Sequence, residues 1–336
     1  MSLESRLCDL FGFTRCVFFG RGRSGLAAVV RVLGGPPVVG PSNACPAVVY
    51  AALAGGGTYL PVAVGPRNGL VNFHEAVIRN AVAMPTHLYG EHVNTDDMKA
   101  DYVLENDTLA VTVDRAFRAV GDALLVSFAH GKTIDAGGGG AILTDSDELE
   151  RDLKIVKSEW LGWTDKDTRI DMECTALRRH GTSAEAMLKT ELEAVGRNCH
   201  NISYKKLEHA LNVRIHKIEK MRSRWLCWQS NLSYFELLEE RDPPPVPWRF
   251  TVHMDCKKNR DAVVKALRAE GYDAGTNYPN LCRSFPRLLG EYHAADADTW
   301  ADTVLNFWLT EDYPDERIHK AAGTIRRVYD ELMAKA

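Results

Sequence analysis

The sequence predicts an α/β fold, in which a mixed, mostly parallel sheet is flanked by helices and followed by a smaller α+β domain. Through the first half of the chain, short apolar strand-like runs alternate with helical patterns. From about residue 146 to 240 the pattern is mainly helical and more charged, and Pro243-Pro244-Pro245 then marks a stiff connection. We therefore expect a large domain at 1–242 and a small C-terminal domain at 243–336.

The expected elements follow in chain order. An amphipathic run at 3–11 predicts the first helix, and two later runs predict helices at 26–33 and 46–53, each after a turn. Short apolar or β-branched runs predict strands at 16–19, 37–39, 58–62, 81–84, 109–113 and 123–128, with one more after the glycines at 137–140. In the small domain a strand at 248–254 precedes a helix at 259–270, which Gly271 ends.

Composition describes an ordinary globular protein and excludes several classes. The chain has 336 residues, 45% apolar and 26% charged, with a net charge of -4, so neither nucleic acid nor an acidic membrane is an expected partner. The longest apolar region, 26–60, is cut by Arg31 and by Pro36-Pro37, which argues against a membrane span. Acidic residues in the first ten positions are atypical of a signal peptide, and the eight cysteines form no C-x-x-C pair. We expect a cytoplasmic location with reduced thiols.

Lys132 is the first candidate catalytic residue. The strand-like run at 123–128 delivers Ser127, and the lysine follows five positions later, ahead of four consecutive glycines at 137–140 that allow a ligand to approach the backbone. A lysine held at the mouth of a sheet in this way is suited to forming a Schiff base with a carbonyl compound. An exposed loop lysine is the alternative interpretation.

The segment Gly20-Arg21-Gly22-Arg23-Ser24-Gly25 follows a strand and opens a helix. Taken literally it is the G-x-G-x-x-G dinucleotide fingerprint, but that site needs an acidic residue about 20 positions later. No Asp or Glu occurs from Leu26 to His74. The segment is therefore interpreted as a phosphate site, in which Gly22, Arg23 and Ser24 offer backbone N–H groups at a helix N-terminus. A purely structural tight turn is the alternative.

Asp114 follows the expected strand at 109–113, where an α/β sheet presents residues to a ligand. A carboxylate there could pair with a protonated pyridine nitrogen and make the ring an electron sink, although a cap or turn role is also common for such an Asp. Phosphate loop, Asp and Lys follow in this order in pyridoxal-phosphate enzymes of the aspartate aminotransferase fold.

These segments resemble the DegT/StrS family of sugar aminotransferases over nearly the whole chain. Four segments carry the resemblance: the phosphate loop 21–26, Pro85-Thr86-His87-Leu88-Tyr89-Gly90, Val113-Asp114-Arg115-Ala116, and the lysine segment, which comprises Ser127-Phe128, Lys132, Gly139-Gly140-Ala141 and Thr144. A fifth segment, 201–210, matches more weakly. The resemblance implies fold type I of the pyridoxal-phosphate enzymes, pyridoxal 5'-phosphate as cofactor, a homodimer with shared active sites, and transfer of an amino group from glutamate or glutamine to a keto-sugar, often nucleotide-linked.

The resemblance also assigns roles. Lys132 would hold the cofactor covalently and then move the proton during transfer, and Asp114 would pair with the ring nitrogen. Ser127 and the Gly22-Arg23 backbone would hold the cofactor phosphate. Asn201, or Asn198 if the register differs, would reach the phosphate of the neighbouring subunit.

Three positions depart from the family pattern. Asn43-Ala44-Cys45 stands where an aromatic residue usually stacks on the ring, so the stacking residue is unassigned. Phe117 replaces a polar residue three positions after Asp114, and the interval from Asp114 to Lys132 is short. Arg21 and Arg23 add positive charge beside the phosphate site, which favours either an anionic substrate or tighter phosphate binding.

Alternatives remain within and outside this activity. His130 lies two residues before Lys132, and family members in which His replaces the lysine are dehydratases, so a dehydratase or lyase of the same fold is one alternative. A cofactor-binding sensor without turnover is another. His200, His209 and His216 have helix-like spacing but lack the carboxylates of a metal site, so we expect a solvated helix face and no metal.

Overall fold

The structure is a computed structural model of the whole chain. It describes residues 1–65, 69–95, 97–108, 121–160, 170, 173–174, 182–197, 202–233, 244, 246–290 and 295–334. The predicted strand at 109–113, Asp114, Phe117, Asn198, His200 and Asn201 lie outside these residues.

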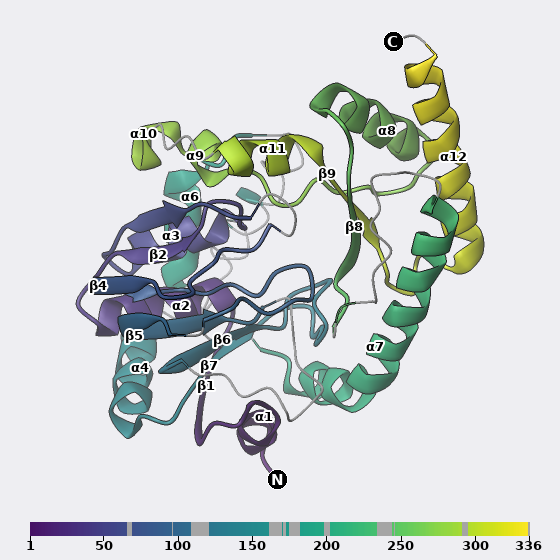
Figure 1. Cartoon of the computed structure of the whole chain (residues 1–336). Coiled ribbons are helices and arrows are strands. Elements are labelled where there is room, and N and C mark those ends of the chain that lie inside the picture. The colour runs from purple at the N-terminus through teal and green to yellow at the C-terminus, as the bar shows by residue number, and fades with distance from the viewer. Residues whose placement is uncertain are drawn as a thin grey trace.

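A seven-stranded sheet forms the centre of the larger part (Figure 1). Its spatial order is β1-β7-β6-β5-β4-β2-β3, with β1 and β6 antiparallel to β7 and the remaining neighbours parallel. The strands are β1 (Arg15–Phe19), β2 (Val38–Pro41), β3 (Tyr59–Val62), β4 (Val77–Ala83), β5 (Lys99–Asn106), β6 (Ala123–Ser127) and β7 (Gly140–Thr144). The mixed, mostly parallel sheet predicted from the sequence is therefore confirmed.

Helices cover both faces of this sheet. The helices of the larger part are α1 (Leu3–Phe11), α2 (Gly22–Val32), α3 (Ala47–Ala54), α4 (Asp147–Glu159), α6 (Leu188–Arg197) and the long α7 (Tyr204–Leu232). The buried side chains of β1 show how the two faces are filled, because successive side chains of a strand point to opposite faces of the sheet. Val17 and Phe19 join the core beneath α2, α3 and α4, whereas Cys16 and Phe18 join the core that α1 and the start of α7 complete.

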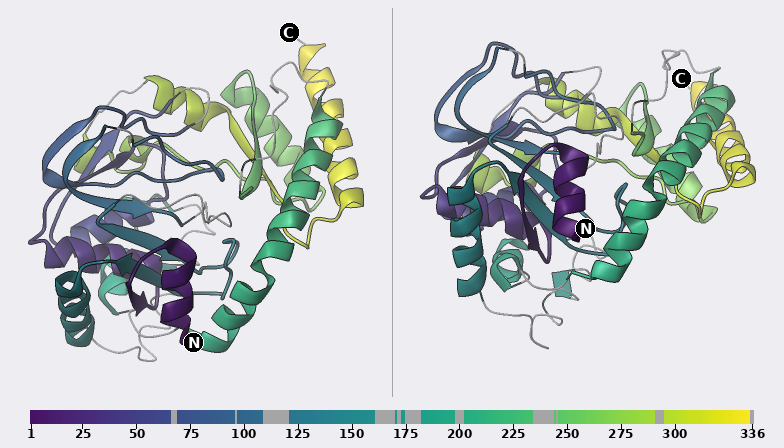
Figure 2. Two further views of the ribbon diagram at one scale, coloured as in Figure 1. Left: turned by 60° about the horizontal axis from the view of Figure 1, so that its bottom comes forward. Right: turned by 90° about the horizontal axis from the view of Figure 1, so that it is seen from below.

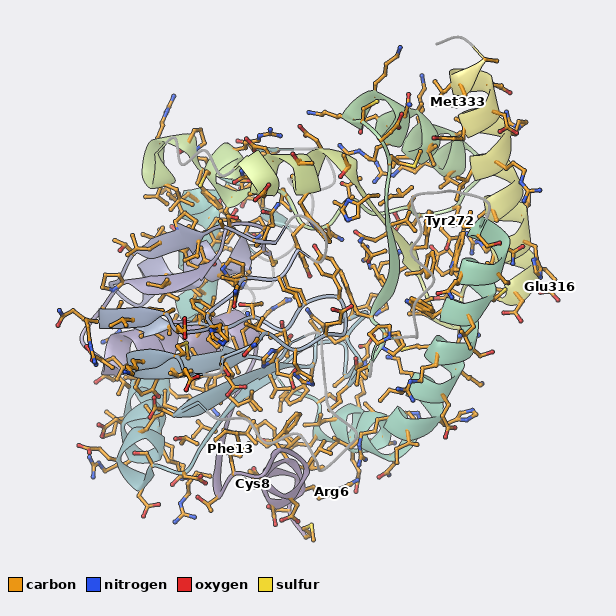
Figure 3. The ribbon with its side chains drawn as sticks, viewed as in Figure 1. Arg6, Cys8, Phe13, Tyr272, Glu316 and Met333 are labelled. Atoms are coloured by element: carbon orange, nitrogen blue, oxygen red, sulfur yellow. The ribbon has the colours of Figure 1, made fainter. Side chains whose placement is uncertain are left out.

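The smaller part is built on a two-stranded antiparallel sheet. Its elements are β8 (Arg249–His253), α8 (Lys257–Ala269), α9 (Leu281–Ser284), α10 (Pro286–Leu289), α11 (Ala295–Thr303), β9 (Val304–Trp308) and α12 (Asp315–Met333). Figure 2 shows α7 running from the large sheet to the side of α12. In Figure 3, Tyr272 points inward toward the β8–β9 sheet, whereas Glu316 lies on the outer side of α12.

The long helix α7 belongs to both parts of the chain. Leu207 and Leu211, near its start, pack in the core beneath the large sheet. Trp225 and Trp228, near its end, pack in the core of the smaller part, where Trp228 stacks on Phe307 with ring centroids 4.2 Å apart. The predicted boundary at 242/243 thus remains a prediction, since α7 already contributes to the second core before that point.

Candidate active site

A cavity of about 580 Å³ opens at the carboxyl ends of β5 and β6, beside the first turn of α2. A volume in this range is typical of sites for small molecules and cofactors. The polar and charged side chains among its lining residues are Arg21, Arg23, Tyr50, Thr86, Asn106, Thr108, Ser127, Lys132, Thr182, Tyr278 and Ser284, and Gly22, Cys45 and Gly139 also contribute. The predicted lysine, the phosphate loop and Ser127 therefore meet at one cavity.

The first turn of α2 faces Ser127 across a short gap. Arg21 caps the helix in an extended conformation, and the backbone of Gly22 and Arg23 follows as the first helical turn at the cavity wall. A Cβ at Gly22 would lie 3.3 Å from the Cβ of Ser127, so glycine keeps this approach open. Backbone N–H groups and the positive end of the helix dipole favour an anion here, with the Ser127 hydroxyl as a further donor.

The side chains of Arg23 and Ser24 take part in helix packing. The guanidinium of Arg23 forms an ion pair with Glu191 of α6, and both side chains are buried. Ser24 is fully buried, and its Oγ donates a hydrogen bond of 2.8 Å to the carbonyl of Val195. Ser24 does not line the cavity, so the structure brings together Gly22 and Arg23 but not Ser24. The charge of Arg23, predicted to add to the phosphate site, is compensated by Glu191.

The loop that carries Lys132 is held by two charged side chains. Asp135 accepts hydrogen bonds of 2.8 Å from the backbone N–H groups of Gly131 and Gly137, one on each carboxylate oxygen. Lys217 of α7 donates a hydrogen bond of 2.8 Å to the backbone carbonyl of Lys132 itself. His130 is exposed, and its Nδ1 lies 3.2 Å from Asp135. These contacts fix the backbone from which the Lys132 side chain enters the cavity.

The electrostatic surroundings of Lys132 favour a reactive amine. Burial lowers its pKa from the ordinary 10.5 to about 8; the nearby Cys45 opposes this shift, and the positive charge of Arg249 adds to it by a smaller amount. A neutral amine is the nucleophilic form, and with this pKa roughly a tenth of the amines are neutral at pH 7. Lys132 therefore has the position and the pKa of a lysine that attacks a carbonyl.

Tyr278 and Cys45 line the cavity at positions that the sequence left unassigned. Tyr278 is buried, and its ring stacks on that of Trp248 with centroids 5.7 Å apart and planes inclined by 2°. Cys45 is exposed and stands directly before the helical segment that opens with Pro46. No sequence pattern near residue 278 indicated a site, because this tyrosine reaches the cavity from the smaller part of the chain.

The residues present fit pyridoxal phosphate. They provide an anion-binding helix start with a serine hydroxyl, a lysine with a lowered pKa, and a buried amide, Asn106, whose Oδ1 accepts no hydrogen bond from the described residues. Among those residues there is no group of three or more His, Cys, Asp or Glu side chains that could hold a metal ion. Likewise, none of the described helices has the length and apolar character needed to cross a bilayer.

An α/β sheet that brings a lysine and the first turn of a helix to one cavity is the arrangement found in the fold of pyridoxal-phosphate aminotransferases. Residues 1–326 match the model of the DegT/DnrJ/EryC1/StrS aminotransferase family, and the chain belongs to this family. This match confirms the resemblance, the fold class and the assignment as an aminotransferase.

Solved structures of similar fold agree with this membership. DesI in the presence of its TDP-sugar product is 19% identical, with a TM-score of 0.77 over 99% of this chain and 86% of that chain. DesV of S. venezuelae, in complex with a ketimine intermediate, is 21% identical, with a TM-score of 0.73 over 96% and 87%. Helicobacter pylori PseC, an aminotransferase of pseudoaminic acid biosynthesis, is 14% identical, with a TM-score of 0.75 over 98% and 90%. No curated protein sequence gives a significant match.

Proposed function

We propose that this aminotransferase uses pyridoxal 5'-phosphate to move an amino group from glutamate or glutamine to a keto-sugar, often a nucleotide-linked one. The observation that carries the proposal is the meeting of Lys132 with Gly22, Arg23 and Ser127 at one cavity, in a chain of this family. The TDP-sugar product in the DesI structure supports a sugar acceptor. Among the described residues no disulfide joins two of the seven cysteines, which supports the cytoplasm as the proposed location.

Each residue has a defined task in this proposal. The backbone N–H groups of Gly22 and Arg23 and the hydroxyl of Ser127 hold the cofactor phosphate, and Lys132 forms the covalent link. When bound, the cofactor supplies a carbonyl that takes up the amino group and a conjugated ring that accepts electrons from the donor's α-carbon. After the donor displaces it, the Lys132 amine would remove the proton from the donor's α-carbon and return it to C4′ of the cofactor.

Two sequence-based assignments lie outside the described residues and stay predictions. Asp114 was assigned to the ring nitrogen, and Asn201, with Asn198 as the alternative, to the phosphate of the neighbouring subunit. The homodimer with shared sites rests on the same resemblance. His130 bears on the dehydratase alternative, but it is exposed and contacts Asp135, whereas Lys132 lines the cavity.

Absorbance and product analysis test the proposal. Purified protein should bind one cofactor per chain, with visible absorbance that Lys132→Ala abolishes in the absence of added amine. After borohydride reduction, the cofactor should be attached to the peptide that contains Lys132. Glutamate or glutamine, without an acceptor, should convert the bound cofactor to its amine form. Attachment to another lysine would refute the assignment of Lys132. Product formed from a sugar without any amino donor would favour the dehydratase or lyase alternative, and cofactor binding without conversion would favour a sensor.

A further inference from the structure

Among the described strands, β5 ends at the cavity beside β6. β5 lies parallel to β6, with Leu104 opposite Ala123 and Asn106 opposite Leu125. β6 ends at Ser127, five residues before Lys132. In open α/β sheets, ligands bind outside the carboxyl ends of the strands, so the last residue of β5 is placed where a cofactor ring meets the sheet.

Alternation along β5 turns Glu105 away from the cavity and Asn106 toward it. Oε2 of Glu105 lies 3.1 Å from Nε2 of His87, and its Oε1 accepts a hydrogen bond of 2.6 Å from the N–H of Gly121. Val93 donates to Nδ1 of His87, so the imidazole proton lies on Nε2 and is donated to Glu105. Glu105 is thus occupied on the opposite side of the strand and does not line the cavity.

Asn106 has the features of a ligand-binding amide. It lines the cavity, the residue is 3% exposed, and its Oδ1 is buried without a hydrogen bond from the described residues. Its backbone is fixed, because its N–H donates to Pro85 and its carbonyl accepts from His87. A buried polar atom without a partner in a cavity wall indicates a group that a ligand satisfies. The next residue, Asp107, is buried but does not line the cavity.

We propose that Asn106, and not Asp114, meets the pyridine nitrogen of the cofactor. This inference rests on the proposed function, in which pyridoxal phosphate binds at Lys132. An ionised carboxylate would stabilise a proton on the ring nitrogen, whereas a neutral amide adds no negative charge. The Asn106 amide carries both an acceptor, Oδ1, and a donor, Nδ2, which exchange places when the group turns by half a rotation about its last bond. With Nδ2 toward the ring, it donates a hydrogen bond to the unprotonated nitrogen. The ring is then held neutral and is a weaker electron sink than with a carboxylate partner.

Nitrogen-15 NMR of the ring tests the proposal directly. The full chain is loaded with pyridoxal phosphate labelled at the ring nitrogen, whose chemical shift distinguishes the protonated from the unprotonated ring. We expect the unprotonated shift in the natural chain, the same shift in Asp114→Asn, and the protonated shift in Asn106→Asp. Visible absorbance of each sample reports separately that the cofactor is bound.

The test does not depend on Asn106→Asp, which could fail to fold. The ring nitrogen shifts of the natural chain and of Asp114→Asn are enough to decide between Asn106 and Asp114. A protonated ring in the natural chain would overturn the proposal, and its loss in Asp114→Asn would return the role to Asp114. Asn106→Ala should keep the unprotonated shift, since no charge is removed. If no cofactor binds to the natural chain, the proposed function itself fails, and the absorbance measurement identifies that outcome before any shift is compared.

Discussion

The ammonium nitrogen of Lys217 donates a hydrogen bond of 2.8 Å to the backbone carbonyl of Lys132. The donor is half-buried near the middle of α7, and the acceptor belongs to the loop that Asp135 organises. Burial lowers the pKa of Lys217, and the nearby charges of Asp135 and Glu311 oppose this shift. The contact therefore joins the helix that reaches the smaller part of the chain to the backbone of the proposed catalytic lysine.

Removing this contact should weaken cofactor binding without unfolding the protein. Lys217→Met keeps most of the side-chain volume but loses a hydrogen bond from a charged donor, which corresponds to ~1.5 kcal/mol, or about tenfold in the cofactor dissociation constant. Absorbance titration measures this constant. Lys205→Met, at an exposed position of the same helix, is the matched control and should bind as the natural chain does. Equal weakening in both variants would contradict a specific role for Lys217.

The lowered pKa of Lys132 predicts how cofactor attachment depends on pH. Only the neutral amine attacks the carbonyl, so the rate constant for attachment to the cofactor-free protein should rise with pH through the lysine pKa of about 8 and level off above it. Stopped-flow absorbance at a fixed cofactor concentration measures this profile. A rate that still rises steeply toward pH 10 would show an unshifted lysine and would contradict the structure.

Arg249 contributes to that shift through its charge. Its guanidinium carbon lies 3.7 Å from the centroid of the Trp308 ring and 4.4 Å from that of Trp248, and its Nε is buried without a hydrogen bond from the described residues. Arg249→Met should move the midpoint of the attachment profile to higher pH, since a nearby positive charge opposes protonation of the Lys132 amine. Arg249→Lys keeps the charge and should keep the midpoint closer to that of the natural chain. An identical shift in both variants would assign the effect to packing.

The ion pair between Arg23 and Glu191 predicts a large loss of stability when one partner is removed. Both side chains are buried, so Arg23→Met leaves a buried carboxylate without this guanidinium and should lower the free energy of unfolding by ~3–5 kcal/mol. The double variant with Glu191→Met should recover part of the loss. Arg31 and Glu159 form a half-exposed pair between α2 and α4, and Arg31→Met should cost only ~0–1 kcal/mol. Urea denaturation of the natural chain, the two single variants and the double variant measures these free energies of unfolding.

Local pattern predicted most elements, and its failures have physical causes. The helix predicted at 3–11 is confirmed at Leu3–Phe11, because its apolar residues recur at helical spacing. β5 was missed because Lys99, Asp101 and Glu105 interrupt its apolar residues, and the neighbouring run at 109–113 looked more strand-like. The strand predicted at 109–113 led to Asp114 as the ring partner and to the short interval before Lys132, and these residues lie outside the described part of the chain.

Long-range contacts explain what the sequence could not indicate about the site. Ser127, Lys132 and the start of α2 could be predicted because each lies at the end of a strand or within a few residues after it. Tyr278 and Lys217 approach from segments about 150 and 85 residues away in the chain, where no local pattern indicates a ligand. The pairing of Arg23 with Glu191 could not be predicted either, because the sequence around the phosphate loop does not indicate which distant carboxylate pairs with Arg23.

The last prediction concerns assembly. The resemblance implies a homodimer in which Asn201, or Asn198, completes the phosphate site of the other subunit, and a C₂ dimer then has two equivalent shared sites. Inactive Lys132→Ala is mixed under subunit exchange with inactive Asn201→Trp. A mixed dimer contains one site with both defects and one with neither, so activity should return to about a quarter of the natural value for random mixing. A monomer by light scattering, or a mixture no more active than its parents with both Asn201→Trp and Asn198→Trp, would exclude shared sites.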